Sequence, residues 1–292
     1  MLVSLVWFFA IRTPFEAAIC PHVAGRCGLS LEIVGPEIPF FHREGSTLRP
    51  TLASRGPWGE ETLSGRAVAG LLGSEIERCH GHPEFVPVRL TVDMFRMSKM
   101  ATVEISTKIL RAGSRIKLVE AEFRNGGEVV AHGLCQFLRR GERPEGAIWQ
   151  PSDWSVPGPD ELPSNEAATS ARGLWDVRQM TGDLRKEVRQ RRAWLREVRE
   201  LVEGEPLTPF ARVAVAADYA SPFSQISPAG LGYINSDLTL YIHRLPEGEW
   251  IGFEVVDHGA TEGISNSACR VYDQAGAIGS VTIAALSQPR RG

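Results

Sequence analysis

Two stretches of sequence decide the fold: RLTVDMFRMSKMATVEISTKILRAGSRIKLVEAEFRNGGEVVAHGLCQFL at Arg89–Leu138, and DLTLYIHRLPEGEWIGFEVVDHGATEGISNSACRVYDQAGAIGSVTIAAL at Asp237–Leu286. The second begins 148 residues after the first, and the two align without a gap. The identical residues are few, among them Leu90/Leu238, Thr91/Thr239, Arg96/Arg244, Ile116/Ile264 and Leu138/Leu286. Turn residues also fall in register, with Asn125-Gly126-Gly127 aligned to the first three residues of Asp273-Gln274-Ala275-Gly276. This shared order of alternating apolar runs and turns predicts one β-rich unit used twice.

A helix is expected before each of these stretches. Within Ser64–Cys79 the apolar residues recur three and four positions apart, which is typical of a helix with one buried face. The second helix, Thr208–Asp218, starts with a Thr-Pro pair suited to a helix N-terminus. In the first half, alternating residues predict antiparallel strands after the helix, at Val86–Arg96, Val103–Leu110, Arg115–Phe123 and Val129–Leu138. The sequence therefore predicts an α+β fold in which each unit is a helix followed by a meander.

The segment Arg185–Val202 gives two conflicting signals. Its residues are strong helix formers, so local propensity favours a helix. The duplication favours a strand near Ala193–Leu201, because the first unit has extended chain before its helix. We predict the strand.

Composition limits the classes of function. The 292 residues are 43% hydrophobic and 23% charged, with a formal net charge of -3, as in a soluble globular protein. A nucleic-acid-binding domain usually carries a basic excess, so no nucleic-acid partner is expected. The basic run Arg185–Arg199 is more typical of a solvated face. Five scattered cysteines argue against a disulfide scaffold and favour a reducing, cytoplasmic location.

We predict four segments in the chain. Residues 1–35 are an atypical extension, because Met1–Ala10 is too short to span a bilayer and lacks the charged start of a secretory signal. No membrane partner is expected from it. Residues 36–141 and 171–288 are the two β-rich units. Residues 142–170 form a linker rich in Pro, Gly and Ser, which Trp149 and Trp154 hold against a surface.

The order of elements resembles the double hot-dog fold, and local motifs resemble the TesB-type acyl-CoA thioesterases, also called thioesterase II. In the first half the similarity lies in Ala53–Trp58 (ASRGPW) and Gly65–Leu72 (GRAVAGLL). In the second half it lies in Ala216–Ser221 (AADYAS), Asn235–Arg244 (NSDLTLYIHR) and Ile278–Leu286. The resemblance covers about residues 36–288. It implies two tandem helix-plus-sheet units that share one continuous antiparallel sheet.

The resemblance also implies a function in lipid metabolism: hydrolysis of acyl-CoA to free acid and CoA without a metal, a cofactor or a covalent nucleophile. In this family an Asp, a Thr or Ser, and a Gln bind the attacking water. The matching positions here are Asp218, Asn235 and Ile283. The first two are the expected catalytic residues, whereas an apolar Ile283 cannot hold a water.

Substrate contacts are expected from Trp58, Gly65 and Arg244, with Arg244 meeting CoA phosphates. The glycine at the start of the first helix also lets an acyl carbonyl approach the backbone N–H groups there. Whether the chain forms a homo-oligomer is left open.

Two functions stay open at this point. One is an acyl-CoA thioesterase, and the other is a non-catalytic protein of the same fold that binds acyl-CoA or an acyl chain. The second follows from Ile283. Asp218 has two corresponding interpretations, as the group that activates water or as a cap on the turn before Ser221-Pro222.

Overall fold

The computed structural model describes residues 37–150, 154–163, 175–183, 186 and 188–288. Every element below belongs to the unit Ile33–Gly292. The predicted extension at residues 1–35 lies outside the described residues. Residues 151–153 and 164–170 of the predicted linker also lie outside them.

The strands repeat with the offset seen in the sequence. In the first half they are β3 (Phe85–Met94), β4 (Val103–Ala112), β5 (Ile116–Asn125) and β6 (Glu128–Arg139). In the second half they are β11 (Tyr233–Asn235), β12 (Asp237–Ile242), β13 (Ile251–Thr261), β14 (Ile264–Asp273) and β15 (Gly276–Ser287). The bounds of β5 and β14, and of β6 and β15, differ by 148 residues at both ends. The internal duplication is therefore confirmed strand by strand.

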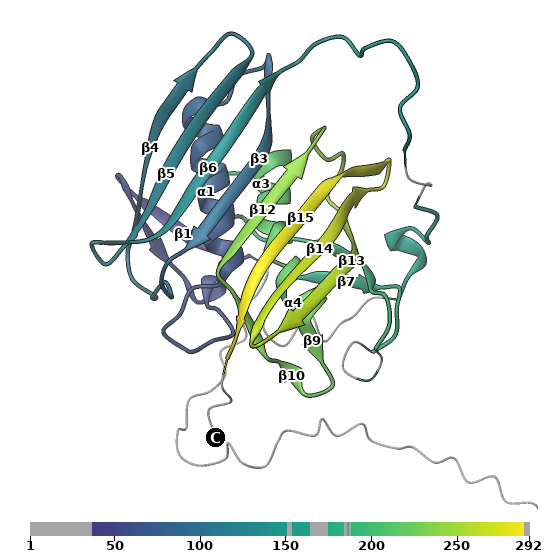
Figure 1. The fold of residues 1–292 in the computed structure, drawn as a ribbon. Coiled ribbons are helices and arrows are strands. Elements are labelled where there is room, and N and C mark those ends of the chain that lie inside the picture. Colours follow the sequence, from purple (N-terminus) through teal and green to yellow (C-terminus); the bar gives the residue numbers. More distant parts are fainter. Residues whose placement is uncertain (1–36, 151–153, 164–174, 184–185, 187, 289–292) are drawn as a thin grey trace, which may run out of the picture. The chain divides into compact units, whose positions relative to one another are not determined.

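These strands belong to one antiparallel sheet whose order mirrors itself about its centre. The order is β1-β2-β4-β5-β6-β3-β12-β15-β14-β13-β8-β7, and β11 also pairs with β15. An outer hairpin completes each half, formed by β1 (Phe41–Glu44) with β2 (Thr47–Pro50), and by β7 (Asp176–Gln179) with β8 (Arg192–Arg196). A separate pair joins β9 (Ile226–Ser227) to β10 (Gly230–Leu231). Figure 1 shows the two halves side by side, joined at β3 and β12. The predicted double hot-dog fold is confirmed.

The two halves meet at a seam between β3 and β12. Thr91 lies directly opposite Thr239, and the two hydroxyl oxygens are 3.2 Å apart. These threonines are equivalent positions of the repeat, so a pseudo-twofold axis passes between them. The register agrees, because Asp93 lies opposite Asp237 on one side of this point and Arg89 opposite Tyr241 on the other.

The helices pack against this sheet and against each other. Helix α1 (Gly65–His80) contacts β3, β4, β5 and β6, and α3 (Pro209–Ala217) contacts α1 and β12. The two helices approach closely at two glycines of α1. A Cβ atom on Gly70 would lie 2.4 Å from Val215 Cγ2, and one on Gly73 would lie 2.8 Å from the Ala214 Cβ. The bounds of both helices match the predicted ones within a residue.

Two predictions about local structure need correction. The turn before Ser221-Pro222 exists at Asp218–Tyr219, and a short helix that was not expected, α4 (Ala220–Gln225), follows it, since proline is tolerated in the first turn of a helix. The strand predicted at Ala193–Leu201 exists but is β8, which ends at Arg196. Trp154 packs against the protein surface as expected, stacked on Tyr272 with ring centroids 4.0 Å apart. Trp149 does not, because it is 82% exposed.

The sheet overrides helix propensity in β8, because Ala193, Trp194 and Leu195 become buried there. The expected solvated basic face is also not what forms. Arg192 pairs with Glu254, and Arg191 donates to two backbone carbonyls. In the part of the chain that the structure describes, every helix is too short or too polar to cross a membrane.

Candidate active site

Antiparallel packing of α1 on α3 brings Asp218 to the start of α1. Asp218 terminates α3, so its side chain leaves the helix next to the N-terminus of its neighbour. A Cβ atom on Gly65, the first residue of α1, would lie 2.4 Å from Asp218 Oδ1 and 2.8 Å from Cγ. The backbone N–H of Arg66 donates a hydrogen bond to the same carboxylate. Glycine at position 65 is therefore what allows the carboxylate and the helix end to touch.

Asn235 reaches the same carboxylate from the sheet. It is the last residue of β11 and lies opposite Ala285 at the end of β15. Its Nδ2 donates to Asp218 Oδ1 over 3.1 Å. The structure thus brings together the two residues predicted to be catalytic, and it places Gly65 beside them.

The environment of Asp218 makes its carboxylate more basic than usual. Asp218 is half-buried, and desolvation by the surrounding protein raises the pKa of its carboxyl above the ordinary aspartate value. The hydrogen bond from Asn235 and the positive charge of Arg66 oppose this shift without cancelling it. A carboxylate with a raised pKa is better matched to accepting a proton near neutral pH.

A buried ion pair lies next to the site, formed by Arg66 at the start of α1 and Glu197. Arg66 Nη1 donates to Glu197 Oε2 over 2.9 Å, and both side chains are almost fully buried. The Arg66 guanidinium also lies over the rings of Phe40 and Trp175, 4.7 and 4.6 Å from their centroids. The sequence alone does not indicate this pair, because Arg66 and Glu197 are 131 positions apart and share no local pattern.

The third family position is apolar here, as the sequence indicated. Ile283 is 3% exposed and faces the interior, while the adjacent Thr282 is exposed on the opposite face of β15. Ser267 lies opposite Ile283 on β14, and its hydroxyl lies 2.8 Å from that of Ser224. Neither Ile283 nor this serine pair replaces the amide of a glutamine.

Ser64 is a polar group that sequence reasoning overlooked. It is the N-cap of α1 and directly precedes Gly65, but its side chain makes no capping hydrogen bond. Its Oγ is buried and has no hydrogen-bond partner among the described residues. Most buried hydroxyls are satisfied, so an unsatisfied one at this helix end can bind a water. In the sequence this position is marked by the serine directly before G-R-A-V-A-G-L-L, which also marks the start of the helix.

The remaining predicted substrate contacts lie in different places. Trp58 is half-buried on a loop whose ends pair through Arg55 and Leu63, just before α1, so it belongs to the same end of that helix. Arg244 lies beyond the other end of β12, and its two terminal nitrogens, Nη1 and Nη2, donate to the Asp273 carboxylate over 2.5 and 2.6 Å. This geometry gives Arg244 a structural role instead of the expected phosphate contact. Within the described residues, no three His, Cys, Asp or Glu side chains gather as metal ligands.

Comparisons with known proteins give a consistent result. The chain matches the acyl-CoA thioesterase N-terminal domain over residues 54–138 and the acyl-CoA thioesterase C-terminal domain over residues 149–285. No protein of curated function matches the sequence significantly.

Solved structures share the fold at low identity. Acyl-CoA thioesterase II TesB2 from Mycobacterium marinum is 17% identical, with a TM-score of 0.60 over 90% of this chain and 98% of that one. The tesB protein of Mycobacterium avium subspecies paratuberculosis is 13% identical, with a TM-score of 0.63 over 85% and 96%. A hot-dog protein from Alicyclobacillus acidocaldarius is 18% identical, with a TM-score of 0.66 over 85% and 96%. Together with the two matching domains, which cover most of the described residues, these results show that the chain belongs to the acyl-CoA thioesterase family.

Proposed function

We propose that the protein hydrolyses acyl-CoA thioesters to a free acid and CoA, with Asp218 as general base. One observation carries the proposal: a carboxylate with a raised pKa is held by Asn235 at the N-terminus of α1. Family membership supports the substrate class. Release of free acids from acyl-CoA would give the protein a role in lipid metabolism.

The proposed reaction begins with a water held between Asp218, Asn235 and the Ser64 hydroxyl. Asp218 takes a proton as the water oxygen attacks the thioester carbonyl carbon, and the carbonyl oxygen becomes an oxyanion. Collapse of this intermediate breaks the carbon–sulfur bond, and the proton on Asp218 returns to the CoA sulfur. The positive end of the α1 dipole, beside Gly65, stabilises the oxyanion. Trp58, on the loop before this helix, contacts the acyl group.

Arg66 limits one part of this mechanism. Its backbone N–H already donates to Asp218, so it serves the base and is not a dedicated donor to the oxyanion. We therefore assign the electrostatic stabilisation to the helix end as a whole. Arg66 and its partner Glu197 are positioning residues, because they act through the carboxylate.

The second candidate is a non-catalytic acyl-CoA-binding protein. Ile283 favours it, because this buried apolar side chain occupies the position where the family has a water-binding Gln. The two candidates differ in turnover and share the ligand. Binding data alone therefore cannot separate them.

Thiol release from acyl-CoA substrates of several chain lengths tests the proposal. Asp218→Asn should lower the rate by about 10²–10⁴-fold, the usual contribution of a general base. Binding of acyl-CoA should change little, since the carboxylate acts on water. A wild type that binds acyl-CoA but releases thiol no faster than buffer would instead establish the binding protein.

Two further variants test the third water contact. Ser64→Ala should slow hydrolysis by roughly 3–10-fold, the value of one ordinary hydrogen bond, without lowering stability, because this side chain makes no capping bond. Ile283→Gln should raise the rate, since an amide would then face the water. An unchanged rate in both variants would remove the third contact from the mechanism.

A further inference from the structure

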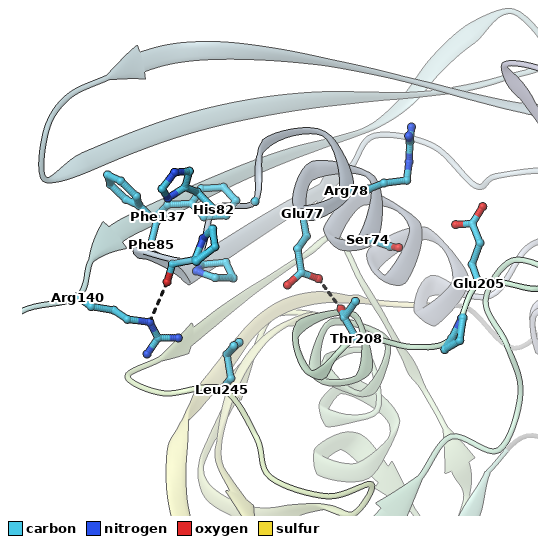
Figure 2. A pocket seen from close by; sticks show the side chains of 14 residues that line it. Ser74, Glu77, Arg78, His82, Phe85, Phe137, Arg140, Glu205, Thr208 and Leu245 are labelled. Carbon is cyan, nitrogen blue, oxygen red and sulfur yellow. Dashed lines mark hydrogen bonds between the residues drawn. The ribbon is translucent and has the colours of Figure 1, made fainter.

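A cavity of about 430 Å³ opens at the other end of the helix pair from Asp218. It is open to solvent on one side and is lined by the C-terminal half of α1, by β3 and β6, and by the chain leading into α3. Figure 2 shows Glu77 and Thr208 pointing toward one another, with Phe85, Phe137 and Leu245 also around it. This volume is in the usual range for small-molecule and cofactor sites. The cavity lies between the two halves of the repeat, as the site at Asp218 does.

The duplication relates the two places. Ser64 and Thr208 are equivalent, because each is the N-cap of the helix that begins its unit. At the start of α1 the carboxylate of Asp218 comes from the facing helix. At the start of α3 the carboxylate of Glu77 comes from α1, and the Thr208 hydroxyl donates to it. A carboxylate from the facing helix therefore lies at each end of the antiparallel helix pair, although its partners differ: Asn235 binds Asp218, and the Thr208 hydroxyl binds Glu77.

The chemistry of the cavity suits an acyl group on an anionic carrier. Phe85 and Leu245, both half-buried, give it an apolar wall, whereas Phe137 beside them is fully buried. Burial raises the pKa of Glu77 above the ordinary glutamate value, as it does for Asp218. At the rim, Arg140 is exposed, and its Nε donates only to the Pro83 carbonyl, 3.3 Å away. Arg140 has no carboxylate partner among the described residues, so its charge is available to a phosphate.

We propose that this cavity is a second binding site for acyl-CoA, related to the Asp218 site by the internal duplication. The acyl chain lies along Phe85 and Leu245, the thioester carbonyl faces Glu77 and Thr208, and the CoA phosphates meet Arg140. The ligand class rests on the proposed function, whereas the existence of the site rests on the cavity. The proposal concerns binding and includes no chemical step.

Binding stoichiometry tests the proposal. Titration calorimetry with short-chain and long-chain S-(2-oxoalkyl)-CoA uses a ligand that keeps a carbonyl and cannot be hydrolysed. The wild type should bind two molecules per chain. Leu245→Trp, which fills the cavity, should bind one, and the volume-conserving control Leu245→Met should bind two. Ser74→Phe, on the α1 wall of the cavity, should repeat the loss if the tryptophan variant fails to fold.

A variant at the other site distinguishes the two proposals. Gly65→Leu drives a side chain into the Asp218 carboxylate and should remove the other binding event. A single wild-type event that Gly65→Leu removes and Leu245→Trp leaves intact would overturn the second site alone. A single event removed only by Leu245→Trp would support the cavity and overturn acyl-CoA binding at Asp218. Absence of binding in the wild type would overturn both.

Discussion

Replacing Gly65 by alanine tests the contact on which the proposed chemistry depends. The new Cβ would lie 2.4 Å from Asp218 Oδ1. Contacts between carbon atoms are optimal at about 3.5–4.0 Å, so the carboxylate must move by about 1 Å. That shift would break the 3.1 Å hydrogen bond from Asn235 and move the base relative to the water.

The expected loss of rate is large for the addition of a single methyl group. A displacement of about 1 Å can cost roughly 10²-fold in rate, which corresponds to about 2.7 kcal/mol of activation free energy. Thiol release from acyl-CoA measures it directly. The matched control is Gly141→Ala, because nothing lies within 4 Å of a Cβ atom placed there.

A double variant shows whether the alanine acts through the carboxylate. If it does, Gly65→Ala combined with Asp218→Asn should be no slower than Asp218→Asn alone. The alanine could then have no further effect, because the base that it displaces is already absent. Rates within twofold of wild type for Gly65→Ala would refute the argument. Full additivity in the double variant would also refute it, because the alanine would then act elsewhere.

Three other predictions follow from the charged groups. Asp218 must be ionised to act as a base, and its pKa is raised. The rate constant kcat/KM should therefore begin to fall at a pH above the ordinary aspartate pKa. A pH profile that stays flat down to the ordinary aspartate pKa would contradict the assignment of Asp218. Arg66→Met should lower the free energy of unfolding by about 3–5 kcal/mol in urea titrations, because it leaves Glu197 buried without its partner. It should also move the acid limb of the pH profile to higher pH, since the positive charge of Arg66 lowers the pKa of Asp218. An unchanged acid limb would show that Arg66 does not act on the site. Arg244→Ala should cost about 1.5–3 kcal/mol of stability through its bonds to buried Asp273, with KM unchanged; a raised KM at normal stability would restore the phosphate role.

The fold was predictable because its signals are periodic. Alternation along the strands and the glycine turns between them survive in both halves, so a constant offset identified every strand from β3 to β6 and from β12 to β15. The segment Ala220–Gln225 was missed because Ser-Pro suggests a turn, whereas proline fits the first turn of a helix equally well. In β8, neighbouring strands decided the structure against local propensity.

The site was predictable only in part, for a similar physical reason. Asp218 and Asn235 fall within motifs, and a strand position fixes the face on which Ile283 lies. The roles of Ser64 and Glu77 depend on how two helices cross, and crossing geometry leaves no local pattern in the sequence. Arg244 shows the converse case, since its motif was visible but its buried partner Asp273 was not.

The seam between β3 and β12 has a consequence for how the protein is made. Thr91 and Thr239 are far apart in the chain, so the first unit leaves the ribosome long before its partner strand exists. Until then β3 has a row of unpaired N–H and C=O groups that can pair with any other extended chain. Joining the halves also requires closure of a long loop, which slows folding. The seam should therefore be the last part of the sheet to form during synthesis and the part most exposed to aggregation.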